Sequence, residues 1–345
     1  MLYSASLEEK VFDIPMHGGD EFVIISGYVG PEPIARLKEL PHNVHTKLIF
    51  GMYGMSGISS ELHKQILVLN KELENVEIYY STIPVHSKIY FMRNNDGEIK
   101  NALVGSANFS VSGLRNDYRE VLSDLDETSY GDLSDYYAII EGNLVHCENA
   151  DTTKIRQVAR SFTFDEQEDE LIQKGICRAT MLVEEDGKTI VPEQSGINWG
   201  CAKKLSGSHV VPGDAYIRIT TDMINKFPQL FPTKKYVNGQ VNSSGKGKKT
   251  RQNDEIELIW DDGYVMKGLL EGSVPHKDGT VIPKQLASSP SKNILGKYLR
   301  SRMGIKDLEY VITKADMERY GRTSVDISLI SEGVYYLDFS PLKHK

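Results

Sequence analysis

Apolar residues in the first half of the chain alternate between short β-rich runs and segments with helical spacing. The runs at 22–28, 45–51 and 76–80 are rich in Val, Ile, Phe and Tyr, which predicts strands. Between them, 33–38 and 59–73 repeat apolar positions at helical spacing. Residues 133–146 return to that helical pattern. This alternation favours an α/β fold in which a mixed sheet is flanked by helices.

The pattern changes from residue 177 onward, where short strand-like pieces recur between turn signals. These predicted strands are 179–183, 215–219, 256–260, 281–283, 325–330 and 334–339. Short helices are predicted at 221–227, 291–303 and 314–320. Such a mix predicts a closed or partly closed β-barrel with a few helices. The charged stretch 151–175 separates the two patterns, and we predict two domains, 1–175 and 176–345.

Composition and charge sharpen this division. The 345 residues are 40% hydrophobic and carry a net charge of −8. Residues 1–177 hold 15 basic and 28 acidic side chains, a balance of −13, whereas residues 178–345 hold 25 basic and 20 acidic ones, a balance of +5. The acidic half should repel nucleic acid outside an active site, and the basic half can supply affinity for phosphate.

Other features of the composition bear on location. No apolar run approaches the ~20 residues that span a bilayer, and no basic stretch with an apolar core opens the chain, so we expect neither a membrane anchor nor a secretory signal. Cys147, Cys177 and Cys201 form no Cys-x-x-Cys pair. This sparse, odd set predicts reduced thiols and a cytoplasmic location.

Candidate chemistry lies in two segments joined by a turn. His86 and Lys88 are two residues apart and would project from one face of a strand. Residues 94–97 read Asn-Asn-Asp-Gly, a hairpin signal. If Asp96-Gly97 is a two-residue turn, Lys88 falls opposite Gly105 and His86 opposite Ala107, or one residue away if the register slips. Either register gathers an imidazole, an ammonium, a hydroxyl and an amide, which suits an anionic group under nucleophilic attack.

The segments His86-Ser87-Lys88 and Gly105-Ser106-Ala107-Asn108 resemble the signature of the phospholipase D superfamily. The usual family Asp, five residues after the Lys, is replaced by Arg93. This departure disfavours a lipase and matters less for the nuclease branch, where a later acid supports the histidine. The resemblance assigns catalysis to His86, Lys88, Ser106 and Asn108, with Glu120 as the later acid. For Ser106 the alternative is a turn cap, and for Glu120 a solvated strand end.

The resemblance also implies a mechanism and an assembly. The chain holds a single His-x-Lys set, and members with one set complete the site as a homodimer, which brings two histidines to one phosphodiester. One His86 would attack phosphorus and form a phosphohistidine, while the other would protonate the leaving oxygen. Lys88, Asn108 and Ser106 would bind the nonbridging oxygens, and Glu120 would fix the tautomer of His86. This mechanism implies no metal and no other cofactor.

Segments of the second half resemble the recognition domain of phospholipase-D-type restriction endonucleases, a pseudobarrel related to the plant B-three DNA-binding fold. They include 197–200, 214–217, 293–300, 320–323 and 335–340. In such domains two arms reach into the major groove of double-stranded DNA. Here the arms would be 199–211 and a stretch near 267–285, and a Gly/Ser-rich basic loop at 243–251 would grip phosphates. Trp199 is also interpreted as a core residue.

The predicted DNA-binding side chains lie in these three stretches. In the first arm they are Lys203, Lys204, Ser206, Ser208 and His209. In the basic loop and the second arm they are Lys246, Lys248, Lys249, Arg251, Lys267, His276, Lys277, Lys284 and Gln285. For any single member a solvated surface role is the alternative.

The leading hypothesis is a metal-independent, sequence-specific DNA endonuclease of a restriction-modification system, with a cognate DNA methyltransferase as its counterpart. Other members of this group work with a separate ATP-dependent helicase-like subunit, and this chain has no Gly-x-x-x-x-Gly-Lys-[Ser/Thr] loop of its own. The alternatives are another phosphodiesterase or phospholipase with the same site, and a DNA-binding protein whose first half is only a dimerisation scaffold.

Overall fold

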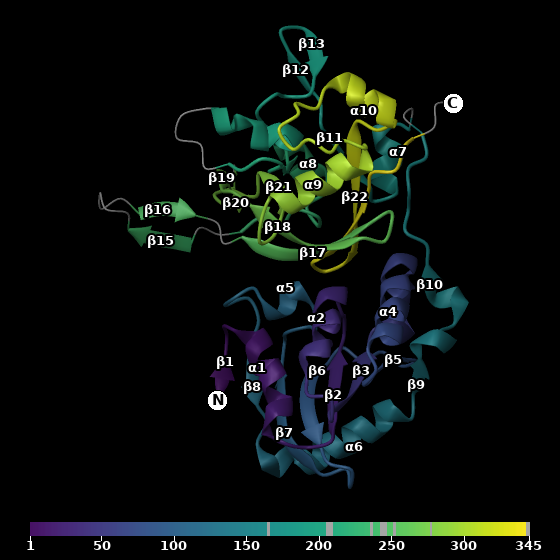
Figure 1. Cartoon of the computed structure of the whole chain (residues 1–345). Coiled ribbons are helices and arrows are strands. Elements are labelled where there is room, and N and C mark those ends of the chain that lie inside the picture. Colours follow the sequence, from purple (N-terminus) through teal and green to yellow (C-terminus); the bar gives the residue numbers. More distant parts are fainter. Residues whose placement is uncertain are drawn as a thin grey trace. The chain divides into compact units, whose positions relative to one another are not determined.

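A computed structural model describes residues 1–163, 166–204, 210–234, 237–241, 247–250, 253–276 and 278–342. The chain forms two compact units, one of residues 1–158 with 330–334 and the other of residues 159–329 with 335–345 (Figure 1). Within the described ranges, no helix is long and apolar enough to cross a membrane.

The first unit is built on an eight-stranded mixed sheet with the spatial order β1-β8-β7-β6-β2-β3-β5-β9. β2 pairs in parallel with β3 and antiparallel with β6, so it is a central strand. Its run Phe22–Ile25 is fully buried, as expected of a strand covered on both faces. The strands are β1 (Leu2–Tyr3), β2 (Glu21–Ser26), β3 (His45–Phe50), β5 (Val76–Ser81), β6 (Lys88–Arg93), β7 (Ile99–Gly105), β8 (Leu122–Asp124) and β9 (Leu144–His146).

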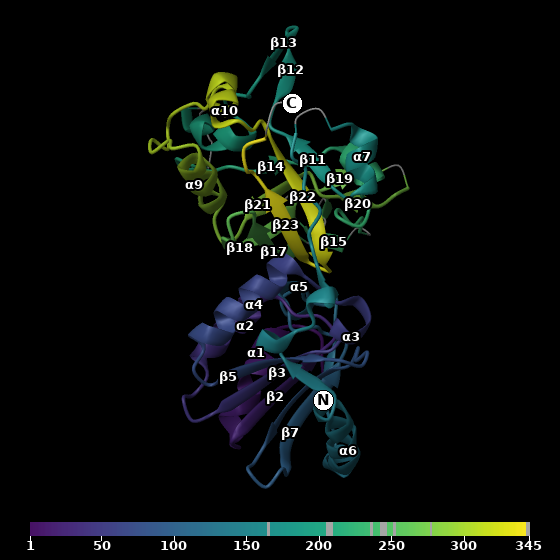
Figure 2. The ribbon, with the colours of Figure 1, turned by 90° about the vertical axis from the view of Figure 1, so that its right-hand side faces the viewer.

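Helices cover both faces of this sheet, with α2 and α4 on one side and α6 on the other (Figure 2). Leu133, Tyr137 and Ile140 of α6 pack in one cluster with the sheet residues Val23 and Ile25. The helices are α1 (Leu7–Asp13), α2 (Pro31–Arg36), α3 (Tyr53–Ser56), α4 (Ser60–Glu72), α5 (Val111–Leu114) and α6 (Tyr130–Glu141). A short parallel pair joins β4 (Ile58–Ser59) to β10 (Ile155–Arg156).

One local prediction in this unit is wrong. The helix predicted over 133–146 ends at Glu141, and 144–146 form the edge strand β9 beside β5. The glycine-rich stretch 51–57 contains α3 with a buried Tyr53. A Cβ atom at Gly51 would lie 2.1 Å from the carbonyl oxygen of Val85, so this glycine lets the stretch pack tightly against the chain that leads to His86.

The second unit is built on a seven-stranded sheet with the order β11-β22-β23-β17-β18-β21-β14. Its outer strands β11 and β14 also contact each other, so the sheet nearly closes into a barrel. These strands are β11 (Cys177–Thr180), β14 (Ile217–Arg218), β17 (Asp254–Trp260), β18 (Val265–Glu271), β21 (Gln285–Ser288), β22 (Ser324–Ser331) and β23 (Val334–Asp338).

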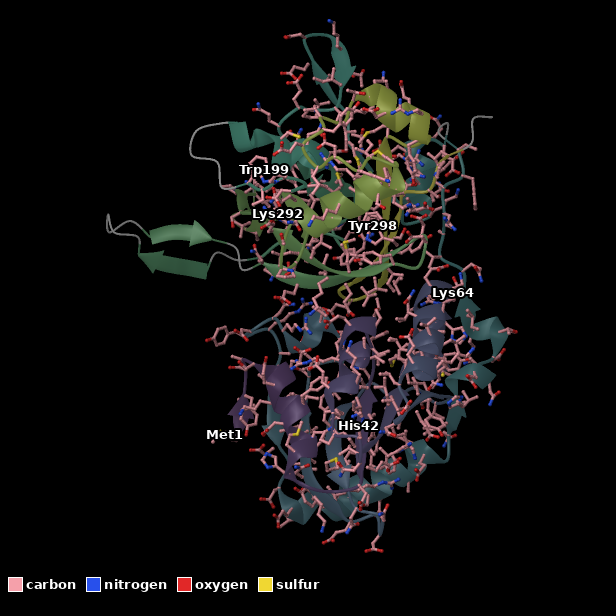
Figure 3. The ribbon with its side chains drawn as sticks, in the orientation of Figure 1. Met1, His42, Lys64, Trp199, Lys292 and Tyr298 are labelled. Atoms are coloured by element: carbon pink, nitrogen blue, oxygen red, sulfur yellow. The ribbon has the colours of Figure 1, made fainter. Side chains whose placement is uncertain are left out.

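Helices and hairpins complete this unit. Tyr298 of α9, labelled in Figure 3, stacks on Tyr264 with ring centroids 5.1 Å apart, and its ring centroid lies 4.6 Å from that of the buried Trp260. The helices are α7 (Glu168–Gln173), α8 (Thr221–Lys226), α9 (Asn293–Arg302) and α10 (Lys314–Tyr320). The hairpins pair β12 (Val183–Glu185) with β13 (Lys188–Ile190), β15 (Val237–Val241) with β16 (Gly247–Thr250), and β19 (Val274–Pro275) with β20 (Val281–Ile282).

Candidate active site

The β6–β7 hairpin brings the two candidate catalytic segments together. Lys88, the first residue of β6, pairs with Gly105, the last residue of β7, and this confirms the predicted register. His86 lies before β6, so the predicted pairing of His86 with Ala107 is wrong because the ladder ends at Lys88. Ser106 and Asn108 follow β7 directly. All four side chains therefore lie at the same end of one hairpin, where β6 begins and β7 ends.

The turn of this hairpin differs from the prediction of a two-residue Asp96-Gly97 turn. The amide of Gly97 donates to the carbonyl oxygen of Asn94 at 2.9 Å, and the amide of Asn94 donates to that of Glu98 at 3.0 Å. The loop thus has three residues, with Gly97 at φ +82°, and the register shifts between Met92 and Arg93. A three-residue loop and a bulge compensate each other, which is why the Lys88–Gly105 pair still forms.

Lys88 and His86 are in direct contact. The Lys88 Nζ atom lies 3.0 Å from Nδ1 and 3.1 Å from Nε2 of His86, and it donates to the His86 carbonyl oxygen at 2.6 Å. The Lys88 side chain is buried, whereas His86 is exposed. Burial lowers the pKa of Lys88, and the negative charge of Glu120 partly opposes this shift. The pair presents an accessible imidazole above a buried cation.

The side-chain oxygens of Ser106 and Asn108 accept hydrogen bonds from backbone amides. The Ser106 Oγ atom accepts from the amide of Val121 at 3.0 Å, and the Asn108 Oδ1 atom accepts from the amide of Tyr28 at 3.1 Å. Within the described residues, neither the Ser106 hydroxyl hydrogen nor the Asn108 Nδ2 group has a protein acceptor. Both donors can therefore serve an anionic oxygen, as in an oxyanion hole.

Glu120 lies near these groups without bonding to His86. Among the described residues, no hydrogen bond joins the two side chains, and the Oε1 atom of Glu120 is 4.0 Å from Nε of Arg119. Burial raises the pKa of Tyr90, and the charge of Glu120 raises it further. The same charge acts on the pKa of Lys88 in the upward direction. Glu120 is thus within electrostatic reach of the site, and its support of His86 stays a prediction.

Arg93, at the position of the family Asp, lies at the far end of β6 from Lys88. It forms ion pairs with Glu21 and, at 3.4 Å, with Glu141, and its guanidinium lies 4.8 Å from the ring centroid of Tyr137. Arg93 therefore joins β2, β6 and α6 and takes no part in the candidate site. In the part of the chain that the structure describes, no group of three or more His, Cys, Asp or Glu side chains has the arrangement of a metal site.

Sequence reasoning missed the third side of the site, which is the end of β2. The Ser26 Oγ atom accepts from the amide of Phe109 at 2.9 Å and donates to the carbonyl oxygen of Tyr28 at 2.5 Å. The rings of Tyr28 and His86 lie edge to face with centroids 6.0 Å apart. These residues are remote from His86 in the sequence, and only the pairing of β2 with β6 brings them together. The small residues Ser26-Gly27 after an apolar strand were the available signal.

Predicted DNA-binding residues of the first arm fall partly on a helix. Residues 196–204 form a 3-10 segment that includes Lys203 and Lys204, and the role of this segment as the start of a DNA-binding arm stays a prediction. Trp199, labelled in Figure 3, is half-buried and packs edge to face on Tyr216, with ring centroids 5.8 Å apart. Ser206, Ser208 and His209 lie outside the described residues.

The predicted basic loop at 243–251 is partly a strand. Lys248 and Lys249 lie on β16, which pairs with β15, so the prediction of a loop is wrong for 247–250. Figure 1 shows this hairpin as a separate ribbon beside the barrel of its unit. Lys246 and Arg251 lie outside the described residues.

The predicted second arm is shorter than 267–285, because both ends belong to the barrel. Lys267 is half-buried on β18 opposite Glu257, and the buried Gln285 of β21 donates to Oε1 of Glu271 at 2.6 Å. The part between them forms the β19–β20 hairpin. There His276 pairs with Asp278 at 2.9 Å. Lys284 is exposed, and Lys277 lies outside the described residues.

Comparisons with known proteins agree with both units. The family model described as the NgoFVII restriction endonuclease N-terminal PLD (phospholipase D) domain matches residues 5–154, and that described as the NgoFVII C-terminal B3-like DNA-binding domain matches residues 171–331. A comparison with curated protein sequences found no match.

Two solved structures are similar over parts of the chain. NucT from Helicobacter pylori is 18% identical with a TM-score of 0.31 and covers 40% of this chain and 89% of its own. Polyphosphate kinase from Porphyromonas gingivalis is 12% identical with a TM-score of 0.32 and covers 48% of this chain and 26% of its own.

The family matches confirm the predicted fold classes, an α/β phospholipase-D-like unit and a mainly-β pseudobarrel for DNA binding. They also agree with the one His-Lys-Ser-Asn set in the first unit and the basic balance of the second. The chain is a nuclease with DNA as its partner, and it belongs to the NgoFVII family of restriction endonucleases.

Proposed function

We propose that the chain cleaves double-stranded DNA at a specific sequence, as the endonuclease of a restriction-modification system, without a metal ion in the phosphodiester step. The observation that supports this most is the set of four groups at one end of the β6–β7 hairpin. An exposed imidazole, a buried ammonium and two donors without acceptors among the described residues suit a phosphate under attack by a nitrogen nucleophile.

The proposed reaction has two steps. His86 attacks phosphorus, the bond to the leaving oxygen breaks, and a second protonated His86 donates its proton to that oxygen. The second imidazole then takes a proton from water, which attacks the phosphohistidine and releases His86. Lys88, Ser106 and Asn108 hold the nonbridging oxygens through both steps. Because each chain has one His86, the second comes from a partner copy in a homodimer.

A division of labour accompanies this mechanism. Residues 1–175 would cleave DNA and dimerise, and residues 176–345 would read the sequence. A cognate methyltransferase would protect the host site. A separate ATP-dependent helicase-like subunit would add its own magnesium requirement, distinct from that of the cleavage step.

Cleavage of genomic DNA by the full chain with and without EDTA tests the proposal. We expect equal cleavage in EDTA, none from the His86→Ala variant, and retained DNA binding by that variant. An acid-labile covalent adduct between the wild-type protein and one DNA strand end, trapped by quenching, would report the phosphohistidine intermediate. Excess His86→Ala protein should depress wild-type activity beyond dilution. Cleavage by His86→Ala, or a magnesium requirement without any ATPase present, would contradict the mechanism.

A further inference from the structure

The end of β2 lies against His86 and Lys88, at the start of β6. Ser26, the last residue of β2, pairs with Lys88, so Gly27 and Tyr28 continue beyond the ladder on the side where His86 lies. Gly27 is buried and Tyr28 is half-buried. The family motifs do not include either residue, and this contact is between segments far apart in the sequence.

Gly27 is needed for the close approach of His86. A Cβ atom built on Gly27 would lie 2.9 Å from Cδ2 of His86 and 3.4 Å from Nζ of Lys88. The backbone of Gly27 is not in the left-handed region, so an alanine would not be strained there by its own conformation. The effect of a side chain at this position therefore falls on the imidazole and the ammonium.

Tyr28 contacts two members of the site through different groups. Its ring meets the imidazole of His86 at an interplanar angle of 78°. The backbone amide of Tyr28 donates to Oδ1 of Asn108. This bond fixes the orientation of the Asn108 side chain and leaves its Nδ2 group as a donor. The Tyr28 hydroxyl has no hydrogen-bond partner among the described residues. The ring and the amide thus contact members of the site, whereas the hydroxyl bonds to none of them.

We propose that Gly27 and Tyr28 are the positioning residues of this active site. Gly27 provides the space in which His86 lies beside Lys88, and the Tyr28 ring restricts rotation of the imidazole. The Tyr28 amide sets the orientation of the Asn108 amide. The inference rests on the proposed function of His86, because positioning an imidazole matters only if that imidazole reacts.

Substitutions in the full chain, assayed on a plasmid that the wild-type protein cleaves, separate these roles. We expect Gly27→Ala to lower the single-turnover rate by about 100-fold, the scale for a misplaced reacting group. Tyr28→Leu should lower it by about 2- to 10-fold, the range to which the energy of an aromatic pair converts. Tyr28→Phe keeps the ring and should restore the wild-type rate. DNA affinity and the melting temperature should not change.

Two matched controls exist in the same unit. Gly131 of α6 has open space around a built Cβ atom, so Gly131→Ala should leave the rate unchanged. Tyr79 meets His146 edge to face with centroids 5.3 Å apart, so Tyr79→Leu removes an equivalent aromatic pair elsewhere. Equal rate losses in the Tyr28→Leu and Tyr79→Leu variants would overturn the inference, because they would report general destabilisation.

The carbon-bound ring protons of His86, observed by NMR and assigned by their loss in His86→Ala, give a readout independent of cleavage. Their signals should move in Gly27→Ala and Tyr28→Leu and stay in place in Tyr79→Leu. Unmoved signals would overturn the inference even if the rates fall. If His86→Ala itself cleaves the plasmid, the proposed function fails, while the NMR signals still decide whether Gly27 and Tyr28 position His86.

Discussion

At the scale of single residues, the candidate site depends on which side-chain atoms already form hydrogen bonds within the protein. Backbone amides occupy the acceptor oxygens of Ser106 and Asn108, and this leaves their donors for substrate. Lys88 likewise bonds to the backbone, because its Nζ atom donates to the His86 carbonyl oxygen. The same atom also lies within hydrogen-bond distance of both ring nitrogens of His86. An anion entering the site would find donors already oriented, so little reorganisation would accompany the reaction.

The lowered pKa of Lys88 leads to a pH-dependent prediction. A buried ammonium loses its proton at a lower pH than an ordinary lysine, whose pKa is 10.5. If Lys88 stabilises negative charge on the phosphate, the cleavage rate should fall on the alkaline side as it deprotonates. Lys88→Arg keeps its charge because a guanidinium has a pKa above about 12. That variant should be slower at neutral pH, but its alkaline decline should move to higher pH.

Single-turnover rates from about pH 7 to about pH 10 would show this displacement. Circular dichroism over the same range serves as the control for unfolding. An alkaline decline at the same pH in both proteins would assign it to another group.

Spacing along the sequence found the residues that one hairpin brings together. His86, Lys88, Ser106 and Asn108 are separated by a single turn, and their proximity follows from local pairing. Gly27 and Tyr28 were not found, because their contact with His86 depends on the non-local pairing of β2 with β6. The burial of Lys88 was equally inaccessible, since it depends on packing around the end of the sheet.

At the scale of elements, the β6–β7 hairpin sets the geometry of the site although its turn is remote from it. The loop closes through Gly97 at φ +82°, and the bulge at Met92/Arg93 absorbs the extra residue. Without that bulge, a register shift of one would move Gly105 out of its place opposite Lys88, while the pairing with β2 keeps Lys88 in place. The turn therefore bears on stability and on where Ser106 and Asn108 lie relative to Lys88.

Gly97→Ala tests the turn. A built Cβ atom there meets nothing within 4 Å, so the cost is conformational, about 1 kcal/mol or more. Calorimetry of the full-length Gly97→Ala variant should show a lower melting temperature only for the transition of the first unit. Gly131→Ala, at a position in the first turn of α6 without positive φ, should not lower the melting temperature. Destabilisation of similar size in both variants would show that the left-handed conformation is not the cause.

Element prediction was less successful where strands are short or belong to hairpins. α10 was predicted at the residues observed, Lys314–Tyr320, and in the structure Thr313 and Asp316 form a capping box at its start. By contrast, β18 was read as part of an arm. Its alternating burial depends on β17 and β21 on either side, and its sequence includes a glycine that packs against Leu258.

At the scale of the whole molecule, charge divides as the functions do. The balance of −13 before residue 178 and +5 after it matches a nuclease domain followed by a DNA-binding domain. Lys248 and Lys249 lie on the β15–β16 hairpin and Lys203 and Lys204 on the 196–204 segment, which are separate elements of the second unit. We expect the two groups to act differently on DNA, the first through phosphates and the second through base edges.

Binding by the full chain, made inactive by His86→Ala, separates the two groups. Replacing Lys246, Lys248 and Lys249 by Gln should weaken cognate and scrambled duplexes alike and reduce the salt slope by about 0.9 for each phosphate that is no longer neutralised. Replacing Lys203 and Lys204 should weaken the cognate duplex most, by about 1–3 kcal/mol if one lysine reads guanine. The control replaces Lys188, Lys306 and Lys314, which removes three charges from elsewhere in the same unit.

Affinities at several salt concentrations distinguish a local effect on DNA from a change in net charge. If the control triple reduces the salt slope as much as the hairpin triple, affinity follows net charge alone, and the β15–β16 hairpin has no special place on DNA. If the Lys203 and Lys204 replacements weaken scrambled duplexes as much as the cognate one, those lysines bind phosphates. The predicted base reading would then fall to other members of the two predicted arms, among them His276, which pairs with Asp278 between the strands of the β19–β20 hairpin.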